Sequence, residues 1–308
     1  MLVSVYIPTR NRVAMLRKAV ESVLSQTHAA VELIVVNDAS TDGTEDYLRA
    51  KAARDNRLTY FSNSTPRGAP ASRNIAIRAS TGIFVTGLDD DDEFLPCRIA
   101  AFLGYWRLLT VAGLNPACLY AQDIWLNNSS QSLVTRKRSS VSVAEIFEYN
   151  YIGNQVFAPR AHFVEAGLFD ERMPAWQDLE FFIRLLQKFG KAHLLDMPTY
   201  LFDVTQRPDR ISSQEKKIRK AFALAAAKHA QGDMARQKSL FLQIFQDGYS
   251  IAPGVSDWAW FLRSGHLPKG LLRMTRSTFA NRKPPQAPVP ERKTISWKQD
   301  REISVGND

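Results

Sequence analysis

The sequence has few of the features that mark disulfide-rich, metal–thiolate or membrane-spanning proteins. It contains two cysteines among 308 residues, Cys97 and Cys118. That is too few for a disulfide framework or a cysteine metal site, so we expect two small buried side chains in a reducing compartment. No stretch approaches the roughly 18 apolar residues of a transmembrane helix. Residues 1–7 lack a basic region before their apolar run, so we expect no signal peptide and a cytoplasmic protein.

Two familiar nucleotide-binding patterns are also missing. There is no G-x-x-x-x-G-K-[ST], and no G-x-G-x-x-G follows the first apolar run. The residues at that place are Pro8, Thr9 and Arg10, which cannot wrap phosphate groups with bare backbone as glycines do. The sequence therefore argues against a P-loop kinase and against a dinucleotide dehydrogenase.

The charge of the chain is unevenly distributed. Overall composition is that of a globular protein, with 45% hydrophobic and 23% charged residues and a net charge of +9. Residues 263–308 hold ten Lys or Arg against four Asp or Glu, and so carry +6 of that charge. Such an end can bind a nucleic acid or an anionic membrane, or simply keep the chain soluble. Residues 267–279 mix basic and apolar side chains in a way that suits a membrane surface, and we expect no nucleic acid partner.

The first part of the chain alternates between two kinds of apolar pattern. Short β-branched runs predict strands, and apolar residues at helical spacing predict the helices between them. Such alternation predicts an α/β fold with a mostly parallel central sheet flanked by helices. Ligands of these sheets bind at the carboxyl ends of the strands. The expected strands cover 2–7, 32–36, 58–61, 83–88 and 117–121, and the expected helices cover 12–26, 42–54, 69–79 and 96–109, with Asp42 and Glu45 at capping-box spacing.

The rest of the chain predicts a helical end. A helix is expected over 178–189, and helices dominate 213–279. Four prolines between 281 and 290 disfavour both helix and sheet. We therefore divide the chain into a nucleotide-binding and catalytic domain over 1–210, a helical C-terminal region over 211–280, and a flexible basic tail over 281–308.

An acidic run follows the fourth expected strand. It reads Asp89-Asp90-Asp91-Asp92-Glu93 and comes directly after the apolar residues 83–88. Carboxylates about 5 Å apart repel by roughly 3 kcal/mol per pair at an effective dielectric constant near 20. A divalent cation such as Mg²⁺ or Mn²⁺ offsets that repulsion directly. A solvated acidic turn is the alternative.

Other polar groups are expected at the same edge of the sheet. A site that combines carboxylates, small polar side chains and arginines suits a nucleoside diphosphate with a metal, since carboxylates hold the cation and arginine binds phosphate. The groups are residues 8–12 after the first strand, 37–44 after the second, Arg73-Asn74 on the helix before the fourth, and the acidic run.

These motifs resemble those of family 2 of the inverting glycosyltransferases. One motif alone is weak evidence, whereas four in the right order over about residues 1–205 are specific. The matching segments are Val3–Arg12, Glu32–Thr44, Arg73-Asn74 with Gly82 and the D-x-D-D stretch at 88–96, and Trp176–Phe181 with its [E/Q]-D pair.

The resemblance implies a GT-A fold, a Mn²⁺ or Mg²⁺ cofactor and a role for each matching residue. The donor would be a nucleotide sugar, most simply UDP-linked, and the acceptor a glycan or lipid-linked intermediate of a bacterial surface polysaccharide. Asp178 would be the general base, and Asp91 with Asp89 would serve the metal. Asp38 would bind the base of the nucleotide. The full set implied for nucleotide-sugar binding is Pro8, Thr9, Arg10, Asn11, Asp38, Arg73, Asp89 and Asp90.

The resemblance has one departure and leaves alternatives open. Relatives often place a metal-binding histidine after the [E/Q]-D helix, but residues 200–212 contain none. Asp203 or Asp209 would replace it, a water would remain on the metal, or Arg207 and Arg210 would bind the diphosphate. Asp42 and Asp178 also have the composition of helix caps. A metal-dependent nucleotidyltransferase and a non-catalytic nucleotide-sugar-binding module are the alternative functions.

Overall fold

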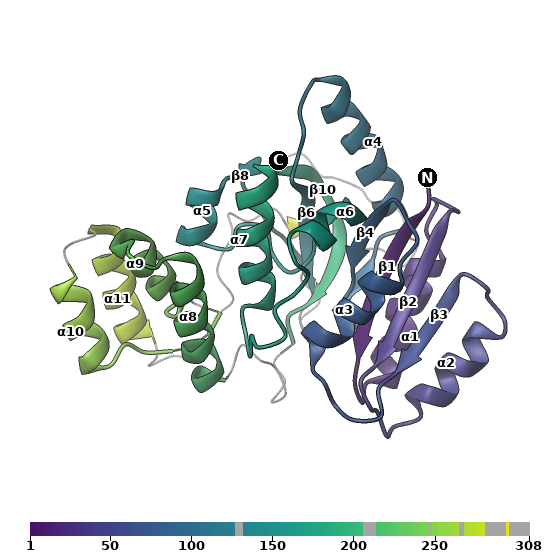
Figure 1. Cartoon of the computed structure of the whole chain (residues 1–308), viewed down its shortest axis with the longest axis horizontal. Coiled ribbons are helices and arrows are strands. Elements are labelled where there is room, and N and C mark those ends of the chain that lie inside the picture. Colours follow the sequence, from purple (N-terminus) through teal and green to yellow (C-terminus); the bar gives the residue numbers. More distant parts are fainter. Residues whose placement is uncertain are drawn as a thin grey trace.

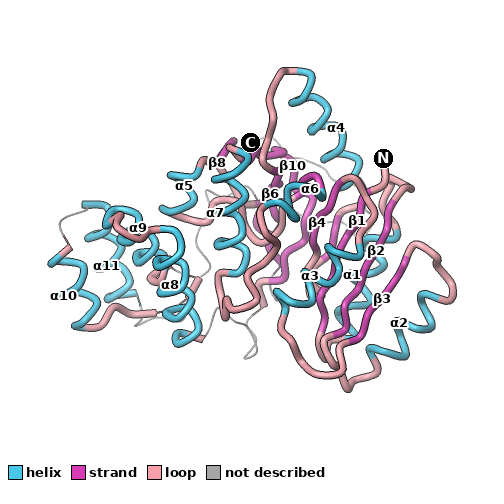
Figure 2. Tube along the Cα trace, in the orientation of Figure 1, coloured by secondary structure: helices cyan, strands magenta, loops and turns pink. Residues whose placement is uncertain are grey.

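The computed structural model describes residues 1–126, 132–205, 214–246, 248–249, 251–264, 268–280 and 294–295. A twisted central sheet with helices on both sides occupies most of the molecule, and a group of helices lies at one end (Figure 1). The tube view separates these two parts clearly, since the magenta strands end before the helical group begins (Figure 2). The predicted α/β fold is confirmed.

The first half of the sheet is parallel. Its two central strands, Val3–Thr9 and Val31–Asn37, are buried along nearly their whole length, which explains their largely apolar sequences. The four strands lie in the order β4-β1-β2-β3, so their carboxyl ends share one edge. The strands are β1 (Val3–Thr9), β2 (Val31–Asn37), β3 (Leu58–Ser62) and β4 (Phe84–Gly87), joined by α1 (Val13–Leu24), α2 (Thr44–Ala52) and α3 (Ala69–Ala79).

The register places the candidate loops next to one another. Thr9 at the end of β1 pairs with Asn37 at the end of β2. Gly87, the last residue of β4, pairs with Tyr6. The acidic run therefore leaves the sheet beside the last residues of β1. Helix α1 packs on one face of these strands and α3 on the other.

The second half of the sheet combines one long parallel pair with short antiparallel strands. Strand β10 (Ala192–Asp203) runs parallel to β6 (Cys118–Leu126) and antiparallel to β5 (Glu93–Phe94) and β8 (Ser140–Val141). The long strands are thus the parallel ones. The remaining elements of this part are β7 (Ser132–Val134), β9 (Phe157–Pro159), β11 (Thr294–Ile295), α4 (Arg98–Val111), α5 (Val143–Glu148), α6 (Arg160–Glu165) and α7 (Gln177–Phe189).

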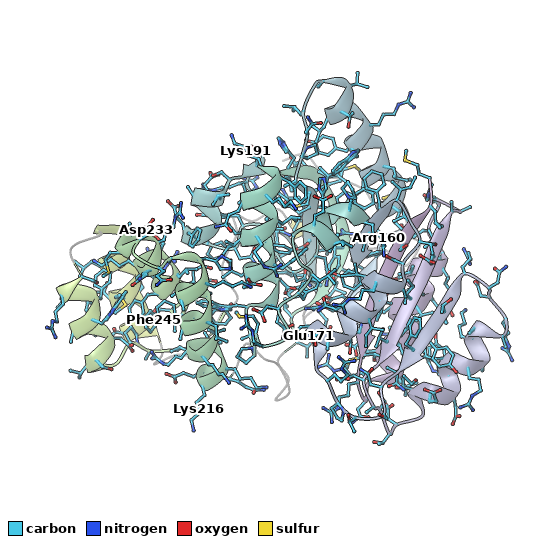
Figure 3. All side chains as sticks on the ribbon, viewed as in Figure 1. Arg160, Glu171, Lys191, Lys216, Asp233 and Phe245 are labelled. Atoms are coloured by element: carbon cyan, nitrogen blue, oxygen red, sulfur yellow. The ribbon has the colours of Figure 1, made fainter. Side chains whose placement is uncertain are left out.

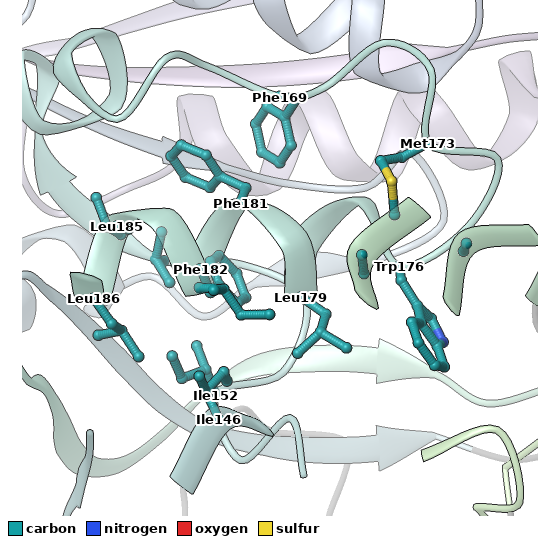
Figure 4. Packing of buried hydrophobic residues seen from close by; sticks show 14 of the residues in the cluster. Ile146, Ile152, Phe169, Met173, Trp176, Leu179, Phe181, Phe182, Leu185 and Leu186 are labelled. Carbon is teal, nitrogen blue, oxygen red and sulfur yellow. The ribbon is translucent and has the colours of Figure 1, made fainter. Parts of the chain in front are cut away.

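Helix α7 is the centre of the larger hydrophobic core. Figure 4 shows the rings of Phe181 and Phe169 as neighbours, and their centroids are 4.6 Å apart. The opposite side of the helix faces Ile146 and Ile152. Burying a large apolar side chain contributes about 1.5–3 kcal/mol. The helix that carries Asp178 is therefore firmly held on both sides.

The helical group at the end of the chain is attached to α7 and α5. Its helices are α8 (Glu215–His229), α9 (Met234–Gln243), α10 (Val255–Arg263) and α11 (Pro268–Ala280). Phe245 lies inside the group, whereas Lys216 extends away from α8 (Figure 3). Gln243 donates from its amide to the carbonyls of Ile146 and Phe147, at 3.0 and 2.8 Å. The division at residues 210 and 280 stays a prediction.

Two local predictions were wrong. Helix α2 begins after Gly43, whose φ of 82° is left-handed, and Glu45 contacts Asn37 and Ser62, so Asp42 and Glu45 form no capping box. Cys97 is exposed just before α4, while Cys118 is buried as expected. Over the part of the chain that the structure describes, no helix has the length and apolarity needed to cross a bilayer.

Candidate active site

The loops after β1 and β2 are joined by their own polar groups. The backbone N–H of Asn11 donates to Ser40 Oγ at 2.9 Å, and Thr41 N–H donates to Asn11 Oδ1 at 2.7 Å. Asn11 and Ala39 have φ values of 53° and 58°, a left-handed conformation that is uncommon for residues other than glycine. Pro8 lies within β1 and is half-buried, whereas Arg10 is exposed at the loop. The predicted residues 8–11 thus line this edge of the sheet.

Asp38 is held by the segment before α3. Its carboxylate accepts from the backbone N–H groups of Arg67 and Gly68, both at 2.8 Å, and from Asn63 Nδ2 at 2.7 Å. The Asp38 N–H donates to Thr9 O at 2.8 Å. Asp38 is buried. It therefore joins three loops at the sheet edge, including the one that leads into α3.

The first two aspartates of the acidic run are held by side chains from neighbouring segments. Asp89 accepts from Arg73 Nη2 at 2.9 Å, Gln155 Nε2 at 3.0 Å and Asn154 Nδ2 at 3.0 Å. Asp90 accepts from Thr9 Oγ1 at 2.8 Å and Arg12 Nη1 at 2.9 Å. Burial raises the pKa of Asp90 to about 6, although Arg12 partly offsets this.

The next two aspartates differ in environment. Asp91 is half-buried and lies 3.4 Å from Arg12 Nη1. Asp92 is buried and accepts from Tyr200 Oη at 2.7 Å and from the Asp203 N–H at 2.9 Å. Burial, and then the neighbouring Asp91, raise the pKa of Asp92 well above its ordinary value. Asp92 therefore supports the loop from inside, and Asp91 is the more accessible of these two carboxylates.

Arg73 connects the acidic run to α7. Its Nη2 donates to Asp89, and its Nη1 donates to Asp178 Oδ1 at 3.2 Å and to Gln177 Oε1 at 3.0 Å. The guanidinium also lies over the ring of Phe169, 5.3 Å from the centroid. Arg73 is buried despite its charge, so its guanidinium is held inside the protein by these partners.

Asp178 is the second residue of α7. The helix cap is Trp176, which has a φ of 56° and is buried, so the reading of Asp178 as an N-cap was wrong. The Asp178 side chain keeps 24% exposure. Burial raises its pKa to about 6, with Arg73 opposing and Asp89 adding to the shift. A carboxylate with such a pKa is partly to mostly ionised near neutral pH and suits proton abstraction.

The sequence alone assigned no individual role to several residues of the site. Arg12, Asn154, Gln155, Gln177 and Tyr200 all contact the predicted aspartates or Arg73. Gln177 is part of the [E/Q]-D pair, and Arg12 is the last residue of the predicted segment 8–12. Asn154 and Gln155, by contrast, lie in an unpatterned stretch after α5. Their contacts bridge more than 60 residues of sequence.

The carboxylates of the acidic run could supply part of the coordination of a divalent cation, with the rest coming from the substrate. Among the described residues, no three His, Cys, Asp or Glu side chains are grouped to hold a metal. Mg²⁺ in nucleotide enzymes needs only one or two carboxylates, because substrate phosphates and water supply the remaining ligands. The resemblance assigns the main part of that role to Asp91, and the oxygens of Asp89 accept three protein donors. Of the expected substitutes for the missing histidine, Asp203 donates its N–H to Asp92, while Arg207, Asp209 and Arg210 lie outside the described residues.

Comparisons with known proteins identify the family. Residues 4–167 match Glycosyl transferase family 2. A protein of Escherichia coli K12, named for colanic acid biosynthesis as glycosyl transferase WcaA, is 32% identical over 249 residues, covering 80% of this chain and 88% of that one. The Escherichia coli UDP-Glc:alpha-D-GlcNAc-diphosphoundecaprenol beta-1,3-glucosyltransferase WfaP is 34% identical over 99 residues, covering 32% of this chain and 39% of that protein.

A solved structure shows the same architecture. The S. aureus TarS 1–349 complex with UDP-GlcNAc matches with a TM-score of 0.64 at 17% identity, over 91% of this chain and 84% of that one. The fold and the motifs at its strand ends define a glycosyltransferase of the GT-A type. The family match and the relative at 32% identity then place it: the chain belongs to glycosyltransferase family 2. The resemblance inferred from the sequence is confirmed.

Proposed function

We propose that this enzyme is a metal-dependent, inverting glycosyltransferase. It transfers a sugar from a UDP-linked donor to a hydroxyl group of a glycan or lipid-linked acceptor in the biosynthesis of a bacterial surface polysaccharide. The UDP-GlcNAc complex of TarS supports the donor class. The names of WcaA and WfaP support the pathway and the acceptor class.

The donor lies along the loops that follow β1, β2 and β4. The nucleoside binds beside Asp38 and residues 8–11, where the register of β1 and β2 brings these loops together. Asp89 and Asp90 complete this side from the acidic run. Because the carboxylates of Asp38 and Asp89 are already fixed by protein donors, they present a preformed edge to the nucleotide.

Asp91 would hold a Mn²⁺ or Mg²⁺, with donor phosphate and water as the remaining ligands. When bound, such a cation would supply stabilisation of the negative charge that develops on the leaving diphosphate. Arg12, which contacts both Asp90 and Asp91, keeps the loop in place before the donor arrives. One carboxylate with phosphate and water ligands satisfies the coordination habit of Mg²⁺.

Asp178 takes the proton from the acceptor hydroxyl as its oxygen attacks the anomeric carbon. The nucleoside diphosphate leaves from the opposite face of the sugar, so one displacement inverts the anomeric centre and no protein nucleophile is needed. The observation that supports this assignment most is a partly exposed carboxylate with a raised pKa, connected through Arg73 to the acidic run.

Two alanine variants test the proposal. Asp91→Ala and Asp178→Ala should each abolish transfer from radiolabelled UDP-sugars while circular dichroism shows an intact fold. Asp46→Ala removes an exposed carboxylate on α2 and should keep full activity. Full turnover in either site variant would sink the assignment. UDP binding without transfer or donor hydrolysis in the wild type would favour a binding module instead. Formation of the nucleotide sugar from a sugar 1-phosphate and UTP would identify a nucleotidyltransferase.

Exposed apolar and basic residues of α10 and α11 suit the surface of an anionic membrane, where a lipid-linked acceptor resides. Residues 263–308 carry +6 of the net charge of +9. Basic residues close to apolar ones on a helix surface favour binding to anionic lipids, at about 1 kcal/mol per Lys or Arg. The exposed residues are Val255, Leu262 and Arg263 on α10 and Leu271, Leu272 and Arg276 on α11.

Vesicle co-sedimentation tests this surface. The double variant Arg263→Glu/Arg276→Glu should lose binding to vesicles containing 30% phosphatidylserine, whereas Lys216→Glu/Lys217→Glu makes the same charge change on exposed positions of α8 and should bind as the wild type does. Binding that is unaffected by the first variant and by deletion of residues 263–308 would rule the surface out.

A further inference from the structure

The guanidinium of Arg73 lies between two carboxylates that are both more exposed than it is. The Asp89 and Asp178 side chains are each 24% exposed, whereas the Arg73 side chain is 7% exposed. A ligand that enters from solvent therefore meets the carboxylates first. This arrangement does not suit the nucleotide contact that family resemblance implies for Arg73.

The two carboxylates depend on Arg73 to different degrees. Asp89 has two further donors, Gln155 and Asn154. For Asp178, Arg73 is the only side chain among the described residues that donates a hydrogen bond. Loss of the guanidinium thus leaves Asp89 anchored but removes the donor that fixes Asp178.

We infer that Arg73 is a positioning residue that orients the base Asp178 for proton abstraction, and that it does not bind the nucleotide. The inference rests on the proposed function, in which Asp178 is the base. Arg73 donates a hydrogen bond to Oδ1 of Asp178 and so fixes the plane of the carboxylate. It also ties that carboxylate to Asp89, so the base keeps a constant distance from the donor loop.

The surroundings of Arg73 are built to hold it still. Gln177 Oε1 accepts from Nη1 at 3.0 Å, and the ring of Phe169 lies beneath the guanidinium. A planar guanidinium can serve two carboxylates at once in a fixed geometry, whereas a lysine ammonium is a single point charge on a flexible stem. Lysine at this position would keep the charge but lose the two-sided geometry.

Kinetic and binding measurements on Arg73→Lys and Arg73→Gln separate the two roles. If Arg73 positions the base, kcat should fall about 100-fold, because a misplacement of about 1 Å in a reacting group costs that much. The Kd for UDP, measured by calorimetry with Mn²⁺ present, should stay within about threefold of the wild-type value. A change of that size corresponds at most to the loss of one weak contact. Arg78→Gln, on an exposed position of the same helix, should change neither quantity.

A double variant shows which carboxylate transmits the effect. Arg73→Gln/Asp178→Asn should be no slower than Asp178→Asn alone, because residues that act as a unit have non-additive effects. The inference would be overturned if the losses in kcat of the two single variants multiplied in the double variant. It would also be overturned if the Arg73 variants bound UDP with a tenfold weaker Kd and kept an unchanged kcat. Circular dichroism establishes that each variant is folded. Sugar transfer by the wild-type enzyme tests the proposed function separately. A failure of the proposed function can therefore be distinguished from a failure of the inference about Arg73.

Discussion

Replacing Glu180 by glutamine should destabilise the protein by about 3 kcal/mol at pH 7. Glu180 is buried on α7, two residues after Asp178. Its carboxylate accepts from Arg184 at 2.8 Å and from His229 at 2.9 Å, and Lys228 lies 2.7 Å away. Two of these partners belong to α8, so the cluster fastens the C-terminal helices to the helix that carries the candidate base.

The magnitude follows from the pKa of Glu180. Burial raises the pKa, but the hydrogen bonds from His229 and Arg184 outweigh it, and the pKa falls from 4.5 to about 2. Each pKa unit corresponds to about 1.4 kcal/mol, so about 3 kcal/mol of stability depends on the ionised form. This contribution is present in full above about pH 4.5 and is lost as the pH falls toward about 2, because the unfolded chain takes up the proton first.

Equilibrium urea unfolding, followed by tryptophan fluorescence and circular dichroism, measures the effect. The gap between wild type and Glu180→Gln should be widest at pH 7 and should narrow as the pH is lowered below about 4.5. Glu165→Gln provides the control, since Glu165 pairs with Lys188 on the surface and exposed pairs contribute about 0–1 kcal/mol. A Glu180→Gln variant within about 0.5 kcal/mol of the wild type at pH 7 would refute the reasoning.

Two further predictions concern the site. Below about pH 6, kcat/KM should fall about tenfold per pH unit, because Asp178 must be ionised to accept a proton. Asp90→Asn should retain this acid limb, and a wild-type profile that is flat to pH 5 would contradict the role of Asp178. Gly87→Ala should lower the thermal unfolding midpoint and weaken donor binding, because the added Cβ would collide with Gln155 and the ring of Tyr6, and overpacking costs about 1–3 kcal/mol. Gly104→Ala meets open space on α4 and should leave both unchanged or slightly improved.

The sequence predicted the sheet and its strand-end loops because these depend on local patterns. Buried parallel strands must be apolar throughout, and an acidic run at the end of one is recognisable from residues 83–93 alone. Helix boundaries were less predictable. Asp42 and Asp178 have the composition of caps, yet the structure begins α2 after Gly43 and caps α7 with Trp176. Left-handed residues at these places decide the boundary, and composition does not reveal them.

The supporting residues of the site were beyond local rules. Asn154 and Gln155 reach Asp89 from an irregular segment after α5. Tyr200 reaches Asp92 from a strand more than 100 residues later. Such contacts follow from the pairing of β10 with β5 and β6, which no single segment encodes. The prediction that Cys97 is buried was wrong for a similar reason, because the exposure of its side chain depends on which segments cover the start of α4.

The left-handed residues Asn11, Ala39 and Trp176 have a consequence for laboratory evolution. Each occupies a backbone conformation that costs of order 1–3 kcal/mol for a residue other than glycine, and each adjoins a loop or helix start of the candidate site. Selection for heat resistance alone would favour relaxing these positions. The same changes would let the loops beside Asp38 and Asp178 settle into other geometries, so gains in thermal tolerance there should come at the expense of turnover. Stabilising substitutions are better sought at exposed positions that do not contact these three residues.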